Sequence, residues 1–194
     1  MAVERTVSEG VASDRAEHRH DLVGRTAASV SMTKRDGRAR SGQAPWLTVI
    51  MPVYRGERWI EASLESLARE ADDGMELLVI DSSPDSHTAD IVRHFSNRVR
   101  LRIEEHSLLP SWQAKTNHAV RIAAADHLCW LHHDDLWLPG RAAAIRRWIN
   151  QAPGAALHIA ASAIIDQDGQ QIGIWRCPFR REGEIPHNVF LEAT

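Results

Sequence analysis

The sequence contains few cysteines and no long apolar run. Only two cysteines occur among its 194 residues, Cys129 and Cys177, and they stand in no metal-ligand spacing. This count argues against a disulfide-stabilised scaffold and favours a reducing compartment. The longest apolar stretch, residues 155–165, is interrupted by His158 and is too short to span a bilayer. The first residues lack the apolar core of a signal peptide. We therefore expect a cytoplasmic protein without a transmembrane segment, either free or peripheral at the inner membrane face.

Neither sign of charge dominates, and the glycine-rich phosphate-binding loops are missing. Lys and Arg number 23 against 26 Asp and Glu, which gives a formal net charge of -3 and does not favour nucleic acid as a partner. The sequence contains neither G-x-G-x-x-G after its first apolar run nor G-x-x-x-x-G-K-[ST] anywhere. The charge of a bound diphosphate would therefore most simply be neutralised by a divalent cation.

Composition changes sharply near residue 45. Residues 1–45 are rich in Ser, Arg, Gly, Ala and Asp and have no sustained apolar period. Such a segment buries too little apolar surface to offset the entropy of ordering it. We interpret it as a disordered tail or an upstream start, and residues 46–194 as the folded domain. The tail's basic residues are interpreted as solvated: Lys34, Arg35, Arg38 and Arg40.

From Trp46 onward, strand-like and helix-like patterns alternate. Apolar runs at 47–53 and 77–80, the second stopping at Asp81, predict buried strands, and alternation at 99–104 predicts a strand with one solvated face. A fourth strand is predicted at 127–131. Helical stripes lie between them, and two more helices are predicted at 115–125 and after Pro139. This order predicts an α/β fold with a Rossmann-like, mostly parallel sheet, flanking helices and a C-terminal hairpin that turns at 166–169.

Polar or aromatic residues follow three of the predicted strands. Tyr54 follows the first strand, Asp81 ends the second, and H-H-D-D follows the fourth at 132–135. Ligands of open α/β sheets bind beyond the carboxyl ends of the strands, so we expect these residues to form one site. Asp134 and Asp135 are candidate ligands for Mg²⁺ or Mn²⁺, because carboxylates suit these cations.

Four segments, in order over roughly a hundred residues, resemble the motifs of the family-2 glycosyltransferases. Residues 48–57 read T-V-I-M-P-V-Y-R-G-E, similar to T-V-I-I-P-V-Y-N-x-E. Residues 76–85 read E-L-L-V-I-D-S-S-P-D, similar to E-L-I-V-V-D-D-G-S-T. Asn117 and Ala119 fall where the family has A-x-N-x-G. Residues 132–139 read H-H-D-D-L-W-L-P, similar to the metal segment D-x-D-D-x-W-x-P.

The resemblance implies a GT-A fold that binds a nucleotide-diphosphate sugar, with a UDP- or TDP-sugar as the expected donor and Mg²⁺ or Mn²⁺ as the cofactor. It implies an inverting transfer to a sugar or lipid-linked acceptor, with the metal acting on the leaving diphosphate. The expected metal ligands are Asp134 and His132. The residues expected to bind the donor are Pro52, Val53, Tyr54, Glu57, Asp81, Lys115 and Asp135.

Three residues depart from the family's pattern. His132 replaces the first Asp of D-x-D, Ser82 the second Asp of D-D-G-S, and Arg55 the common Asn. The family's acceptor-side half, which carries the catalytic base, normally lies beyond the position of Thr194, so residues 46–194 are expected to be the donor-binding part and no catalytic residue is predicted. A non-catalytic nucleotide-sugar-binding remnant and a sugar nucleotidyltransferase stay open as alternatives. The latter usually has a glycine- and arginine-rich loop after its first strand.

Structural roles stay open for several of these residues. Asp81 is also a candidate N-cap of the following helix, and Lys115 a candidate solvated helix residue. Asp134 and Asp135 could form a solvated turn. The two adjacent histidines could be a structural pair or zinc ligands, although no further Cys or His stands at a zinc spacing. Three tryptophans are predicted to be core or sheet-covering aromatics rather than sugar platforms: Trp112, Trp137 and Trp148. For Trp112, an approach to the ligand stays open as an alternative.

Overall fold

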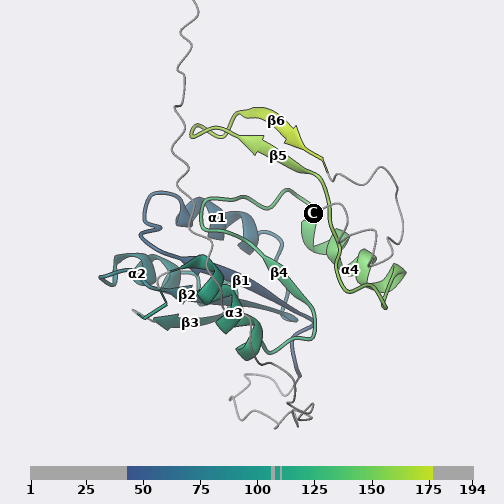
Figure 1. The fold of residues 1–194 in the computed structure, drawn as a ribbon, viewed down its shortest axis with the longest axis horizontal. Helices are drawn as coiled ribbons and strands as arrows, with labels where there is room; N and C mark the ends of the chain where they lie inside the picture. Colours follow the sequence, from purple (N-terminus) through teal and green to yellow (C-terminus); the bar gives the residue numbers. More distant parts are fainter. Residues whose placement is uncertain (1–42, 106–107, 110, 177–194) are drawn as a thin grey trace, which may run out of the picture. The chain divides into compact units, whose positions relative to one another are not determined.

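Four parallel strands form the main sheet, and their order across it differs from their order in the chain (Figure 1). The computed structural model describes residues 43–105, 108–109 and 111–176. The strands are β1 (Leu47–Val53), β2 (Met75–Asp81), β3 (Arg100–Glu105) and β4 (Leu128–Trp130). They pair in the order β3-β2-β1-β4, and every pair is parallel. The sequence prediction of a mostly parallel α/β sheet is confirmed. Residues 1–42, which are most of the predicted tail of 1–45 and include its basic cluster, lie outside the described residues, as does Cys177.

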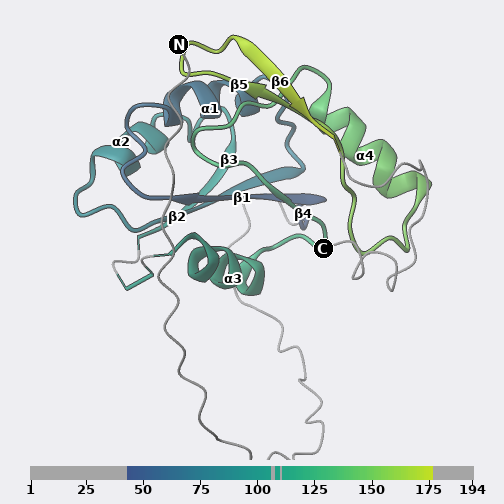
Figure 2. The same cartoon turned by 45° about the horizontal axis from the view of Figure 1, so that its top comes forward.

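Helices cover both faces of this sheet (Figure 2). They are α1 (Ile60–Ala68), α2 (His87–Arg93), α3 (Trp112–Ile122) and α4 (Arg141–Gln151). α1 and α2 follow β1 and β2 and lie on one face, whereas α3 lies on the other. The chain reverses its direction across the sheet between β3 and β4, where the connecting helix also changes face. The three crossovers therefore share one hand, as parallel connections do.

The core divides between the two faces of β1 and β2, whose residues are all buried. Side chains of one parity, such as Val49 and Met51, join the cluster of α1, α2 and α4, which includes Leu64 and Ile145. Side chains of the other parity, including Ile50, Leu78 and Ile80, pack with Ala119 of α3. A strand buried on both faces needs apolar residues at consecutive positions, which explains the continuous apolar runs in the sequence.

The ends of α3 differ from the prediction of 115–125. The helix starts at Trp112 because the Ser111 side chain caps it, accepting a hydrogen bond from the Ala114 N–H at 3.1 Å. It ends at Ile122, whose carbonyl accepts a hydrogen bond from Arg102 at 2.8 Å. Beyond that point the Ala125 N–H donates to Thr48 Oγ1 at 3.1 Å rather than to a helix carbonyl.

Two other elements refine the predictions. β3 is partly buried along most of its length instead of alternating between buried and solvated residues. The predicted hairpin is present as β5 (Ser162–Ile165) and β6 (Gln171–Trp175), which pair antiparallel. In its turn Asp166 Oδ1 accepts the N–H groups of Asp168 and Gln170, both at 2.9 Å, and Gly169 has a φ of +78° that favours glycine.

Candidate functional site

The carboxyl ends of β2, β1 and β4 meet at one edge of the sheet. Val53 of β1 stands in register with Asp81 of β2, and Ile50 of β1 with Trp130 of β4. Because β1 lies between the other two strands, the residues that follow it are flanked by both of their loops. The chain leaves β1 toward β2, whereas it reaches β4, on the other side of β1, through α3 on the opposite face. The strand order therefore reverses between β1 and β4, and open α/β sheets bind ligands at such a switch point.

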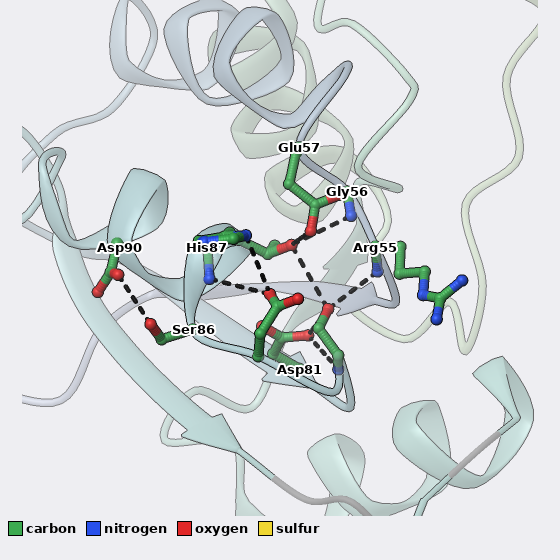
Figure 3. A network of polar contacts seen from close by, with 10 residues as sticks. Arg55, Gly56, Glu57, Asp81, Ser86, His87 and Asp90 are labelled. Carbon is green, nitrogen blue, oxygen red and sulfur yellow. Dashed lines mark hydrogen bonds and ion pairs between the residues drawn. The ribbon is translucent and has the colours of Figure 1, made fainter.

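Asp81 organises the loop after β2 (Figure 3). Its side chain is 2% exposed, and its Oδ1 accepts hydrogen bonds from the Ser83 N–H at 2.8 Å and the Ser83 hydroxyl at 2.6 Å. The Ser83 hydroxyl in turn accepts the Arg55 N–H at 2.9 Å. The alternative of Asp81 as a helix N-cap is wrong, because α2 begins at His87 with Ser86 as its cap residue. Asp81 instead ties the β2 loop to the β1 loop.

A second set of contacts holds the loop after β1. Thr88 of α2 is buried, and its hydroxyl donates to Glu57 Oε1 at 2.7 Å and accepts the Gly56 N–H at 3.2 Å. Gly56 has no room for a side chain, since a Cβ there would lie 2.9 Å from Val53 Cγ1 and 3.2 Å from His133 Cδ2. The β1 loop therefore touches the β2 side through Thr88 and the β4 side through His133.

Lys115 reaches the site from α3 with its side chain 2% exposed. Its ammonium donates to the Val53 carbonyl and, at 2.8 Å, to the Ser82 hydroxyl. Loss of hydration lowers the pKa of Lys115 below that of an ordinary lysine, while the Asp81 carboxylate raises it in part. The alternative of a solvated helix residue is wrong. Lys115 therefore links the ends of β1 and β2 from the face of the sheet that α3 covers.

Tyr54 presents a half-exposed aromatic ring at the site. It is 50% exposed, with the Arg55 guanidinium carbon 5.4 Å and Lys115 Nζ 5.7 Å from its ring centroid. Pro52 and Val53 are buried in β1, so only their backbone is near the edge. Two cations beside one half-exposed aromatic ring favour an aromatic ligand that carries negative charge.

The segment after β4 folds back in a tight turn. The His132 carbonyl accepts the Asp135 N–H and the Ser63 hydroxyl, both at 3.1 Å. The His132 ring meets the Trp112 ring edge-on, with centroids 6.2 Å apart and planes at 70°. Loss of hydration raises the pKa of Asp135 above that of an ordinary aspartate, and the adjacent Asp134 carboxylate raises it further. Asp134 and Asp135 are nonetheless both exposed residues.

This segment fits a hard divalent cation better than zinc. No three His, Cys, Asp or Glu side chains of the described part of the chain are grouped to hold a metal. The buried His133 Nδ1 has no hydrogen-bond partner there, and the His133 ring lies against Gly56, with Cδ2 3.2 Å from the position of a Cβ at Gly56. Mg²⁺ and Mn²⁺ need only one or two protein carboxylates when ligand phosphates and water complete the shell, and Asp134 and Asp135 are open to such a cation.

The tryptophans divide differently from the prediction. Trp137 is 7% exposed and belongs to the core, and Trp148 packs against that core as expected. Trp112 was predicted to be core or sheet-covering, and this is wrong: it is 56% exposed at the first turn of α3, beside His132. Ser83 and Thr88 were missed altogether, because hydroxyl side chains follow no hydrophobic period that would single them out.

A hollow of about 190 Å³ lies at the opposite edge of the sheet, before β1 and β4. Arg146, one of its lining residues, already pairs with Asp72 at 2.6 Å and stacks over Trp46 at 4.2 Å. Its charge is therefore satisfied within the protein. The hollow is lined by Pro45, Trp46, Asp126, His127, Arg146, Ile149 and Asn150.

Comparison with known proteins gives consistent results. A sequence model of the family described as Glycosyl transferase family 2 matches residues 48–180. The Escherichia coli UDP-Glc:alpha-D-GlcNAc-diphosphoundecaprenol beta-1,3-glucosyltransferase WfgD is 29% identical over 96 residues, which are 49% of this chain and 37% of that protein. A Rickettsia typhi protein described as an uncharacterized glycosyltransferase is 21% identical over 98 residues, 50% of this chain and 30% of that protein.

Among solved structures, that of S. aureus TarS 1-349 is similar, with a TM-score of 0.51 and 20% sequence identity. The match covers 67% of this chain and 46% of that one. The matched region thus spans less than half the length of each of these proteins. The likeness shows the fold, which is GT-A as predicted. No helix within the described ranges is both long enough and apolar enough to cross a membrane.

Proposed function

Because this chain belongs to glycosyl transferase family 2, we propose that its carboxyl-edge site binds a nucleotide-diphosphate sugar together with Mg²⁺ or Mn²⁺. UDP- and TDP-sugars are the expected donors, and the reaction is inverting transfer of the sugar to a sugar or lipid-linked acceptor. One observation carries the proposal. A half-exposed tyrosine, a buried aspartate and a carboxylate-rich turn follow three adjacent parallel strands, at the switch point of the sheet.

Tyr54 and Asp81 form the nucleoside end of the proposed site. The Tyr54 ring offers a stacking surface for the base, and the Asp81 carboxylate accepts hydrogen bonds from the nucleoside. Pro52 and Val53 contribute backbone beside them. Lys115 positions this end, because its ammonium holds the Val53 carbonyl and the Ser82 hydroxyl. Glu57 keeps the β1 loop in place through Thr88.

The turn after β4 forms the phosphate and sugar end. Asp134 and His132 are the proposed protein ligands of the cation, and Asp135 lies beside them, where it can accept hydrogen bonds from water in the cation's shell. When bound, the divalent ion supplies a Lewis acid that stabilises the leaving diphosphate. The acceptor oxygen forms a bond to the anomeric carbon as the bond from that carbon to the diphosphate breaks. The electron pair leaves with the diphosphate, and the acceptor proton passes to a base.

A second candidate function is donor binding without turnover. His132 favours it, because a neutral imidazole contributes less charge toward Mg²⁺ than the aspartate usual at this position. A sugar nucleotidyltransferase is less well supported, because the loop after β1 reads Y-R-G-E and is not rich in glycine and arginine.

Isothermal titration of the full chain tests donor binding. UDP, TDP and GDP are titrated in EDTA and again in Mn²⁺, and we expect at least one of them to bind more tightly with the metal. Asp134→Asn should remove the gain from Mn²⁺. Asp126→Asn is the matched control, because Asp126 is an exposed aspartate before β4, at the opposite edge. The proposal fails if none of the nucleotides binds with metal present.

A donor-hydrolysis assay on the same protein then separates the two candidate functions. Release of the nucleotide diphosphate from a donor that binds would support the transferase. Binding without release, at saturating donor and metal, would support the non-catalytic alternative.

A further inference from the structure

Arg55 occupies the centre of the proposed site. It directly follows Tyr54 at the end of β1, the strand that lies between β2 and β4. The nucleoside end is proposed on the β2 side and the cation on the β4 side, so a diphosphate joining them must pass the end of β1. The next residue, Gly56, packs against His133, so the loop that carries Arg55 lies against the segment after β4.

The backbone of Arg55 is held in an unfavourable conformation. Its φ of +51° is the only positive value among the described residues other than glycine. Side chains with a Cβ disfavour this left-handed region by roughly 1 kcal/mol. The N–H bond to the Ser83 hydroxyl, at 2.9 Å, ties this conformation to the Asp81 network. Strain that the surrounding contacts enforce is a reason to look for a function of the side chain.

The Arg55 side chain is a cation without a carboxylate partner in the described part of the chain. It is exposed and lies beside the Tyr54 ring, whose centroid is 5.4 Å from the guanidinium carbon. Figure 3 shows the guanidinium directed away from the Asp81 carboxylate. The other cation beside Tyr54, Lys115, is buried, and its ammonium is bound to Val53 and Ser82. Arg55 is therefore the cation here that is available to a ligand.

We propose that Arg55 binds the diphosphate of the donor directly. Its positive charge would supplement that of the metal ion, whose proposed site has His132 in place of the usual aspartate. This inference rests on the proposed function. A guanidinium matches two phosphate oxygens at once, and its charge does not depend on pH in the range where proteins fold. Donor binding should accordingly keep a measurable, metal-independent part that depends on Arg55.

The test compares Arg55→Gln with Arg58→Gln by isothermal titration. Arg58 is the matched control, an exposed arginine of the same loop whose guanidinium stacks on the Trp59 ring at 4.2 Å. The ligands are UDP, TDP and GDP and their monophosphates, each in EDTA and in Mn²⁺. In EDTA, we expect Arg55→Gln to reduce the affinity for the nucleoside diphosphate that binds best by about ten- to hundredfold, as for a lost charged hydrogen bond. The affinity for the monophosphate should fall less. The affinities of Arg58→Gln should stay within about twofold of those of the wild type.

Arg55→Gly separates binding from folding. Glycine accepts the left-handed conformation, so this variant should keep or raise the melting temperature while it loses diphosphate affinity. If Arg55→Gln binds the diphosphate as tightly as the wild type, or if both glutamine variants weaken it equally, the inference is overturned while the proposed function stands. If the wild-type chain binds no nucleotide at all, the proposed function fails and this inference fails with it.

Discussion

The Lys115 ammonium donates a hydrogen bond to the Ser82 hydroxyl at 2.8 Å and so connects α3 to the end of β2. This lysine is buried, and its pKa lies below the ordinary value of 10.5 because of lost hydration. The unfolded chain therefore holds the Lys115 proton more tightly than the folded chain does. The free energy of unfolding should rise with pH between the folded pKa and 10.5, since the cost of burying the charge is then removed.

Lys115→Met should remove this rise. Urea denaturation of wild type and variant from pH 7 upward is the measurement, and the wild type should gain stability relative to the variant as pH increases. Lys34→Met is the control, since Lys34 is the chain's other lysine. Stability curves that stay parallel over the alkaline range would contradict the prediction.

Gly56→Ala should destabilise the protein and weaken donor binding together. The added Cβ would lie 2.9 Å from Val53 Cγ1 and 3.2 Å from the His133 ring, so the β1 loop must move away from the β4 segment. Overpacking of this kind costs about 1–3 kcal/mol. Gly154→Ala is the control, because nothing lies within 4 Å of its Cβ position. Chemical denaturation and nucleotide titration check both effects, and equal behaviour of the two variants would refute the steric explanation.

Trp137→Ala should mainly reduce stability, whereas Trp112→Ala should mainly reduce affinity for the donor sugar. Trp137 is 7% exposed, and its truncation should cost about 3–5 kcal/mol of the free energy of unfolding. Trp112 is 56% exposed, so its truncation should cost well under half as much. Because Trp112 contacts His132 at the phosphate and sugar end, its loss should reduce affinity for the donor sugar more than for the nucleotide alone. Equal losses for both ligands would place Trp112 outside the sugar contact.

Ser83→Ala should weaken nucleoside diphosphate binding about tenfold and cost about 1–3 kcal/mol of stability, because it leaves the Arg55 N–H without a partner and Asp81 with the Ser83 N–H alone. Ser86→Ala is the matched control in the same loop, where the hydroxyl donates only to the exposed Asp90. Thermal denaturation and isothermal titration distinguish the two serines. The prediction is wrong if Ser86→Ala has the larger effect on binding.

The strands and the polar residues at their ends were predictable, because a strand buried on both faces needs a continuous run of apolar residues. β1 and β2 are buried on both faces, so their apolar runs are continuous and stop where the chain reaches the edge at Tyr54 and Asp81. The hairpin was predictable from the turn that Gly169 permits. The burial of β3 was less predictable. Its apolar and charged residues alternate in the sequence, but most of them are partly buried.

The remainder depends on contacts between distant residues. The start of α3 is set by the Ser111 cap and its end by Arg102, which reaches it from β3. The exposure of Trp112 follows from that shifted start. The burial of Lys115 depends on its bonds to Val53 and Ser82, which neither hydrophobic period nor charge pattern encodes.

The Ser83 hydroxyl should also make the nucleoside and diphosphate contacts of the proposed donor energetically dependent on one another. It joins the Asp81 carboxylate to the Arg55 N–H, so a nucleoside at Asp81 and a diphosphate at Arg55 would contact a single hydrogen-bonded loop. The first part of the ligand to bind then orders the loop, and the second part binds without a further loss of loop entropy. A double-mutant cycle of Asp81→Asn with Arg55→Gln should accordingly be non-additive, and separate fragments should bind cooperatively.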